Sequence, residues 1–139
     1  MSEDFKNQRE YRIFGVFFLG IIFFFTSAYF ATSKVRFLSS AEESIGVVTN
    51  LTAGGSHPEI EFSSKTGQSY TTNQGGFIFG YKEGMQVKVY YLPEDPGISA
   101  VIDDIGAIWY TPAFFAIFSV VLFGYGTLEI IRRKRDLRK

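Results

Sequence analysis

Hydrophobic residues form two long runs in this chain, and the stretch between the runs alternates between apolar and polar positions. The first run, residues 13–31, has nineteen residues and no charge, and the second, 112–131, has a single charge at Glu129. At 1.5 Å per residue, a helix over the first run extends about 28 Å, close to the ~30 Å hydrocarbon core of a bilayer. The sequence therefore predicts two membrane-spanning helices, at residues 13–33 and 108–131.

The residues that flank both runs fit a membrane interface. Thr111 is a favourable N-cap, and Pro112 suits the first position of a helix, where its missing N–H costs nothing. Aromatic rings with a polar edge favour the headgroup level, and arginines at the cytoplasmic end contact anionic lipid. The predicted interface anchors are Tyr11, Trp109, Tyr110, Arg132 and Arg133.

A cleavable signal peptide is the alternative interpretation of the first run. Basic residues precede the run, and small residues at positions 26–28 offer a cleavage site. The run is longer than the apolar stretch of about 7–15 residues that signal peptides have. The head before it also contains three acidic residues, so we favour a membrane helix that is retained.

Charges divide unequally between the ends and the middle of the chain. The head, residues 1–12, has three lysines or arginines and the tail, 132–139, has six, whereas residues 34–107 have five against nine acidic residues. Basic segments stay on the cytoplasmic side of a membrane. We therefore expect both termini in the cytoplasm and residues 34–107 outside, on a bacterial cytoplasmic membrane. The balanced total of fourteen basic and fourteen acidic residues gives no support to nucleic-acid binding.

Three segments of the middle region have the period of two that is typical of strands. The residues predicted to share a face are Ile45, Val47, Thr49 and Leu51 in the first; Ile60 and Phe62, with Glu59 and Glu61 toward water, in the second; and Met85, Val87, Val89 and Tyr91 in the third. Turn-forming glycines and prolines separate the segments. The predicted fold class is membrane α+β, a two-helix transmembrane hairpin with an inserted small antiparallel β-sheet or barrel of about five or six strands.

The same region resembles a known membrane family. The matching residues, in order, are Gly46-Val47-Val48, Ile60-Glu61-Phe62, Thr66-Gly67, and then Val87, Val89, Tyr91, Pro93 and Pro96. This pattern between two apolar helices is similar to the family catalogued as domain of unknown function 3592, over about residues 44–102. The resemblance implies an extracytoplasmic β-domain on a helical hairpin and no particular activity. Apart from any family, Tyr91, Pro93 and Pro96 indicate a strand end followed by a stiff turn.

Residues that could carry chemistry are few. The chain has no cysteine and one histidine, His57, which we interpret as a solvated turn residue because a metal site draws on several such ligands. Neighbouring residues of a strand point to opposite faces, so neither Glu42-Glu43 nor Asp103-Asp104 forms a shared acid–base site by itself. We expect both pairs to solvate the junctions with the helices, and we predict no catalytic, cofactor or metal site.

Aromatic residues are concentrated between glycines at positions 76–81. The favoured interpretation is a short strand with Phe77 and Phe79 in the core. The alternative is a loop that enters lipid or offers aromatic anchors to a partner. The candidate contact residues are then Phe77, Ile78, Phe79 and Tyr81.

Small residues recur on one face of each apolar run. They are Gly20, Ser27 and Ala31 in the first run, and Ala113, Ala116, Val120, Gly124 and Thr127 in the second. Small residues let helix backbones approach closely in lipid. We expect the two helices to pack on each other, with a second copy or a larger membrane partner as the alternatives. Glu129 is expected to pair with Arg132 and Arg133, at i+3 and i+4, rather than to serve a proton path.

The leading functional hypothesis is a non-enzymatic integral membrane protein whose β-domain binds another protein or an envelope component. It would act as an accessory subunit, an assembly factor or an immunity-type inhibitor, with the lipid bilayer and a membrane or extracytoplasmic protein as partners, or a second copy through the helices. One alternative is a membrane-bound enzyme that uses Glu59, Glu61, Asp103 and Asp104. A channel or transporter component is another, although neither run has a polar stripe to line a path.

Overall fold

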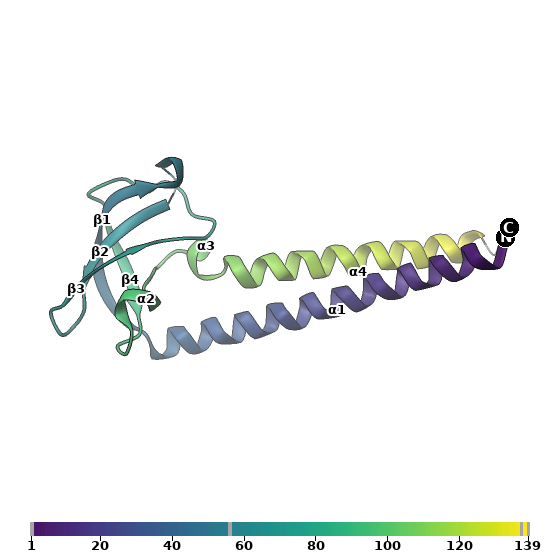
Figure 1. Ribbon diagram of the computed structural model, residues 1–139, viewed down its shortest axis with the longest axis horizontal. Coiled ribbons are helices and arrows are strands. Elements are labelled where there is room, and N and C mark those ends of the chain that lie inside the picture. Colours follow the sequence, from purple (N-terminus) through teal and green to yellow (C-terminus); the bar gives the residue numbers. More distant parts are fainter. Residues whose placement is uncertain (1, 56, 137, 139) are drawn as a thin grey trace. The chain divides into compact units, whose positions relative to one another are not determined.

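The computed structural model describes residues 2–55, 57–136 and 138. The chain divides into two compact units, which we call the helical unit, Met1–Phe30 with Pro112–Lys139, and the β unit, Ala31–Thr111. The β unit contains the predicted β-domain, residues 34–107. Figure 1 shows the elements of both units.

Two long helices contain the apolar runs. Helix α1 covers Ser2–Ser40 and helix α4 covers Tyr110–Asp136, and both are long and apolar enough to cross a membrane by length and composition. Helix α1 is longer than the predicted span at both ends because neither glycine nor proline interrupts residues 2–14 or 21–45. Helix α4 begins at Tyr110, so Thr111 lies inside the helix rather than at its N-cap.

Helices α1 and α4 of the helical unit run antiparallel, side by side, with the start of α1 and the end of α4 at the same end of the pair (Figure 1). Serine hydroxyls connect them: Ser119 Oγ donates to the Gly20 carbonyl at 3.0 Å, and Ser27 Oγ donates to the Pro112 carbonyl at 2.8 Å. The prediction that the helices pack on each other is therefore confirmed, and Gly20 and Ser27 are at the contact.

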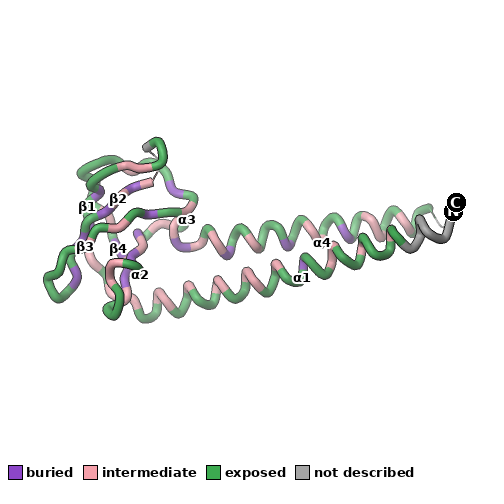
Figure 2. Tube along the Cα trace, viewed as in Figure 1, coloured by how far each residue is buried: buried purple, intermediate pink, exposed green. Residues whose placement is uncertain are grey.

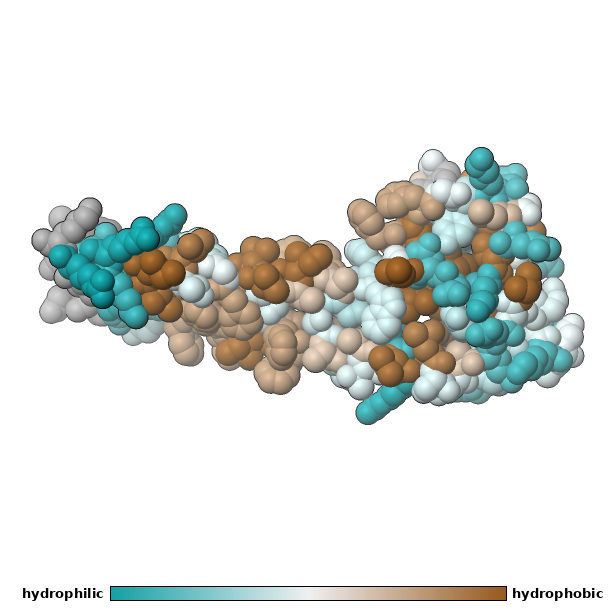
Figure 3. Space-filling view, turned by 180° about the vertical axis from the view of Figure 1, so that it is seen from behind, coloured by the Kyte–Doolittle hydropathy of each residue, from teal (hydrophilic) through white to brown (hydrophobic). Residues whose placement is uncertain are grey.

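The packing face predicted for the second helix is wrong. Ala113, Ala116, Val120, Gly124 and Thr127 are all exposed, and the buried residues of α4 are Pro112, Ser119 and Gly126, spaced seven apart. A Cβ atom at Gly126 would lie 2.7 Å from the Phe17 ring, whereas one at Gly124 would meet nothing within 4 Å. Both stripes contain small residues, but only the buried one faces α1, where Ser119 contacts the Gly20 carbonyl and Gly126 the Phe17 ring. Apolar side chains cover much of the outer surface of the pair (Figure 3).

The β unit is built on a curled antiparallel sheet of five strands, so the predicted small antiparallel sheet is confirmed (Figure 1). The strands are β1 Glu42–Thr52, β2 His57–Ser63, β3 Ser69–Asn73, β4 Gln86–Tyr91 and β5 Val101–Ile102, in the order β3-β2-β1-β4-β5. Within the described residues β3 and β5 do not pair with each other, so the sheet is open rather than a closed barrel. Short helices η1 (Ala53–Gly55), α2 (Pro96–Ser99) and α3 (Ile105–Ile108) occupy the connections.

The central strand β1 has the opposite orientation from the one its apolar residues suggest. Ile45, Val47 and Thr49 do share a face, but that face is exposed, with Ile45 61% and Val47 39% accessible. Gly46 and Val48 point into the core instead. The inner face is tight at this point, because a Cβ atom on Gly46 would lie 3.0 Å from both Val89 Cγ2 and the Glu61 carbonyl oxygen.

The core lies on the inner face of the sheet, where the buried residues of Figure 2 gather on the strands. The core residues are Val48, Ile60, Phe62, Ile78, Val89, Tyr91, Ala100 and Ile102. The inward positions predicted for β2 and for Val89 and Tyr91 of β4 are thus confirmed, whereas Met85 precedes β4 and is exposed. Phe62 packs against two rings, Tyr70 and Tyr91, with centroids 5.7 and 5.4 Å apart.

Candidate functional site

The aromatic loop, residues 76–81, has no strand, and its two phenylalanines are on the surface. Phe77 is 69% and Phe79 66% exposed, so the expected strand with both rings in the core is wrong. The two rings meet edge to face with centroids 5.2 Å apart, and Phe77 stacks on Tyr110, the first residue of α4, at 6.5 Å. The loop therefore presents an aromatic cluster beside the residue at which an apolar helix begins.

Buried contacts hold this loop in place. Ile78 is 1% exposed and belongs to the core, and the Tyr81 hydroxyl donates to Asp104 Oδ2 at 2.7 Å. Burial, and then the Asp104 carboxylate, raise the pKa of Tyr81, so its hydroxyl stays protonated and keeps donating. Phe77 N also donates to the Gly106 carbonyl at 3.1 Å. Ile78 and Tyr81 thus anchor the loop and are not the surface contacts that the sequence suggested.

The neighbouring carboxylates Asp103 and Asp104 have separate structural roles. Asp104 caps helix α3, with Oδ1 accepting from Gly106 N at 2.7 Å, while its other oxygen accepts from Tyr81. Asp103 turns away and pairs with Lys88 at 3.8 Å. The expectation that the two carboxylates point apart is confirmed, and both have protein partners rather than only solvent.

Glu42 and Tyr91 form a second polar cluster at the start of β1. The Tyr91 hydroxyl donates to Glu42 Oε2 at 2.8 Å and accepts from Lys65 N at 3.0 Å, and Lys65 Nζ pairs with Glu42 Oε1 at 3.1 Å. The Tyr91 hydrogen bond, followed by Lys65, lowers the pKa of Glu42. Strand β4 ends at Tyr91, Pro93 lies in the following turn and Pro96 begins α2, as the expected stiff turn requires.

The outer face of the sheet combines exposed aliphatic residues with acidic ones. Val47 of β1 lies opposite Glu61 of β2 and Gln86 of β4, and Ile45 lies opposite Lys88. We use the name outer face for the half-buried Glu59 and the exposed residues Glu43, Ile45, Val47, Thr49, Glu61, Gln86, Lys88 and Asp103. The sequence could not reveal this surface, because its valine and isoleucine read as core residues.

The residues considered for metal binding or catalysis have other contacts in the described part of the chain. Of the described residues, no group of three or more histidines, cysteines or acidic residues could hold a metal ion. His57 begins β2 opposite Thr52, in a strand rather than in the expected turn. The four carboxylates considered for an enzyme each have a different partner: Glu59 with Thr49, Glu61 with Ser69, Asp103 with Lys88 and Asp104 with Tyr81.

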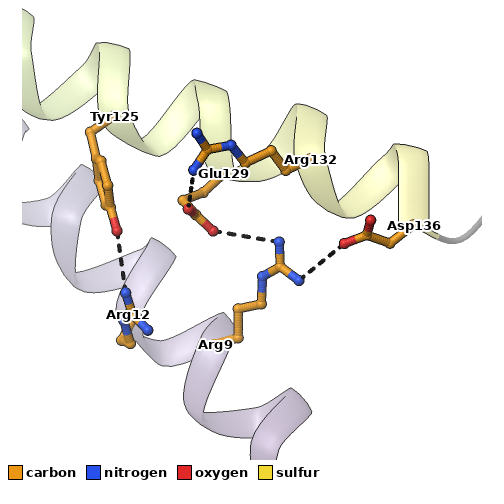
Figure 4. Close-up of polar contacts among 6 residues, drawn as sticks. All are labelled: Arg9, Arg12, Tyr125, Glu129, Arg132 and Asp136. Atoms are coloured by element: carbon orange, nitrogen blue, oxygen red, sulfur yellow. Dashed lines mark hydrogen bonds and ion pairs between the residues drawn. The ribbon is translucent and has the colours of Figure 1, made fainter.

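A cluster of ion pairs lies where α1 begins and α4 ends (Figure 4). Glu129 pairs with Arg132 at 3.3 Å, as expected, and also with Arg9 of α1 at 3.5 Å. Arg9 extends to Asp136 at 3.6 Å. Arg133 pairs with Glu10 instead of Glu129, and Arg12 donates to the Tyr125 hydroxyl at 3.2 Å. Sequence spacing finds the local pair, but the contribution of Arg9 depends on the antiparallel packing of the helices.

Comparison with known proteins gives one informative match. Over 106 residues the chain is 43% identical to a protein of Pseudomonas aeruginosa named immune protein Tsi4. The matched segment makes up 76% of this chain and 72% of the relative. No family model matches the chain, so the resemblance to domain of unknown function 3592 stays a prediction. No solved structure matches it either.

Proposed function

We propose that this chain, which belongs to the same family as the immune protein Tsi4, is itself an immunity protein that binds and neutralises a protein toxin without catalysing a reaction. The observation that carries the proposal is the 43% identity over 106 residues. The separate structural partners of the acidic side chains agree with a binding role, because acid–base catalysis needs carboxylates that converge on a substrate.

Residues 13–33 and 108–131 are the two spans that anchor the protein in a bacterial cytoplasmic membrane. The apolar outer surface of the helices supports this location, since such side chains are stable against lipid and not against water. The excess of lysine and arginine in residues 1–12 and 132–139 supports cytoplasmic termini and an extracytoplasmic position for residues 34–107. Tyr11, Trp109, Tyr110, Arg132 and Arg133 then lie at the two interfaces.

The aromatic loop contacts the outer leaflet rather than the toxin. Its support is the stacking of Phe77 on Tyr110, the first residue of α4, which lies two residues before the apolar run. Aromatic rings are favoured at the headgroup level. The toxin is left to bind elsewhere on the β unit.

The immunity function is tested by growing a strain that lacks this gene together with its parent in mixed culture. We expect the deletion strain to lose ground in the mixture and to regain its share when the full-length chain is supplied. Equal persistence of both strains in the mixture would contradict an immunity role.

Membrane orientation can be tested separately because the chain has no cysteine. A single cysteine is introduced by Lys82→Cys in the β unit or by Arg138→Cys in the tail. A membrane-impermeant maleimide should label the first variant on intact spheroplasts and the second only after lysis. The reverse pattern would refute the proposed orientation.

A further inference from the structure

The outer face of the sheet is the most distinctive exposed surface of the β unit, and we infer that it binds a lysine- and arginine-bearing surface of the toxin. The inference rests on the proposed immunity function and specifies where and by what chemistry the toxin is bound. Ile45 and Val47 form the apolar centre of the contact, and acidic side chains form its rim.

The centre of this surface lies on a strand that is paired on both sides. Strand β1 has β2 on one side and β4 on the other, so Ile45 and Val47 stand in the middle of the sheet, yet they are 61% and 39% exposed. Branched side chains favour extended backbone, and this preference is enough to explain a single isoleucine or valine at an exposed position of a strand. Two of them together, ringed by polar residues, match the apolar centre and polar rim of a protein interface.

The rim is strongly acidic. It contains the four carboxylates Glu43, Glu59, Glu61 and Asp103 and one amine, Lys88. Lys88 Nζ lies between Glu43 and Asp103, at 3.5 and 3.8 Å, and compensates that side of the face. On the opposite side, on β2, no lysine or arginine among the described residues offsets the negative charge.

Glu59 and Glu61 supply the uncompensated charge. Glu59 accepts from the Thr49 hydroxyl at 3.2 Å and Glu61 from the Ser69 hydroxyl at 3.1 Å. Within the described residues, neither carboxylate forms an ion pair with a lysine or arginine. A hydroxyl holds a carboxylate in position and leaves its charge intact, so both side chains are available to cations of a partner.

The sign of the charge decides among possible occupants. Anionic lipid is repelled by this face, and so is the same face of a second copy. A protein surface rich in lysine and arginine is attracted, and complementary charge accelerates its association and fixes its register. The outer face therefore suits a basic toxin surface with an apolar patch at its centre.

The test uses the mixed-culture assay with the full-length chain and a charge-reversed variant. E59K/E61K reverses the two uncompensated charges on β2, at the half-buried Glu59 and the exposed Glu61. E83K/E94K makes the same change of net charge at exposed turn positions elsewhere in the β unit. We expect E59K/E61K to fall to the level of the deletion strain and E83K/E94K to protect like the unmodified chain. Both variants should accumulate in the membrane at the normal level.

Each outcome decides a separate question. If the unmodified chain fails to restore the deletion strain, the proposed immunity function itself is refuted. If the unmodified chain protects and both variants protect equally, or both fail equally while accumulating normally, the outer face is not the binding surface. Should E59K/E61K not accumulate, E59Q/E61Q, which removes the same charges without adding any, takes its place with E83Q/E94Q as the control.

Discussion

The helical unit and the β unit place the same kind of side chain in opposite environments. In the helical unit, Phe14, Phe18 and Phe25 are more than half exposed, whereas in the β unit Phe62 is 2% exposed and packed between two tyrosine rings. The β unit builds its own apolar interior, as a domain in water must. The helical unit buries little and turns its rings outward, and it joins its helices through glycine, serine and close ring contacts. The contrast teaches that the β unit closes its apolar side chains into a core, whereas the helical unit leaves most of its own on the surface.

The largest effect should come from removing a ring of the β core. Phe62→Ala deletes a fully buried side chain, which destabilises a small domain by about 3–5 kcal/mol. We expect the β unit of the purified full-length protein to lose resistance to protease at room temperature. Phe79→Ala removes the same ring from an exposed position and should leave protease resistance unchanged, and equal sensitivity of both variants would refute the assignment of the core.

A smaller effect is expected from crowding the helix contact. Gly126→Leu places a side chain against the Phe17 ring, and overpacking of this kind costs about 1–3 kcal/mol. Gly124→Leu makes the same change two residues away, where nothing is in contact. Because the chain has no cysteine, spin labels on cysteines at exposed positions 22 and 121 report the helix separation. The separation should widen in the first variant only, and widening in both would contradict the packing face.

The stability of the β unit should fall at acidic pH because of the Glu42 cluster. The lowered pKa of Glu42 means that the unfolded chain takes up this proton more readily, so the stabilisation is complete above the ordinary glutamate pKa of about 4.3 and is lost as pH falls through the lowered value. As pH is lowered, the melting temperature of the β unit should therefore fall less steeply in Glu42→Gln than in the unmodified chain. Glu94→Gln, which changes an exposed carboxylate, is the control, and an equal slope in all three proteins would refute the role of the Glu42 cluster.

The smallest effect concerns the ion pairs at the end of the helical unit. Arg9→Gln removes the pairs with Glu129 and Asp136, and exposed pairs of this type contribute roughly 0–1 kcal/mol. Melting of the helix pair should shift by a few degrees at most, and salt should abolish the difference. Arg135→Gln, for which the described residues offer no ion pair, is the matched control. If Arg9→Gln lowered the melting temperature of the helix pair as much as Gly126→Leu does in the same measurement, charge rather than close packing would hold the helices together.

The sequence predicts the elements of both units better than it predicts which face of each element is buried. The period of two in β1 separates Ile45 and Val47 from Gly46 and Val48, but both sets are apolar or small, and only the pairing with β2 and β4 decides which one faces the core. Helix α4 likewise offers two stripes of small residues, and only the contacts with Gly20 and Phe17 of α1 decide which of them is buried.

At the aromatic loop the local sequence pattern also failed to predict which residues are buried. Alternating aromatic residues read as a strand, but Gly76 and Gly80 have φ values of 111° and 85°, which interrupt extended backbone on both sides of Ile78. Ile78 consequently takes the core position and both phenylalanines turn outward. The pair Glu129–Arg132 was predictable because four consecutive residues define it, whereas the Arg9 contact joins residues at opposite ends of the chain.

The insertion of residues 31–111 between two paired helices has a consequence for the unfolded chain. While α1 and α4 stay together, both ends of the β unit remain tethered, and the unfolded segment is a closed loop with fewer conformations than a free chain. For a loop of this length a single cross-link removes unfolded-state entropy equivalent to about 4 kcal/mol. The helix pair acts as such a cross-link. A β unit that is cut from its helices should therefore unfold more readily, even with every native contact of its sheet preserved.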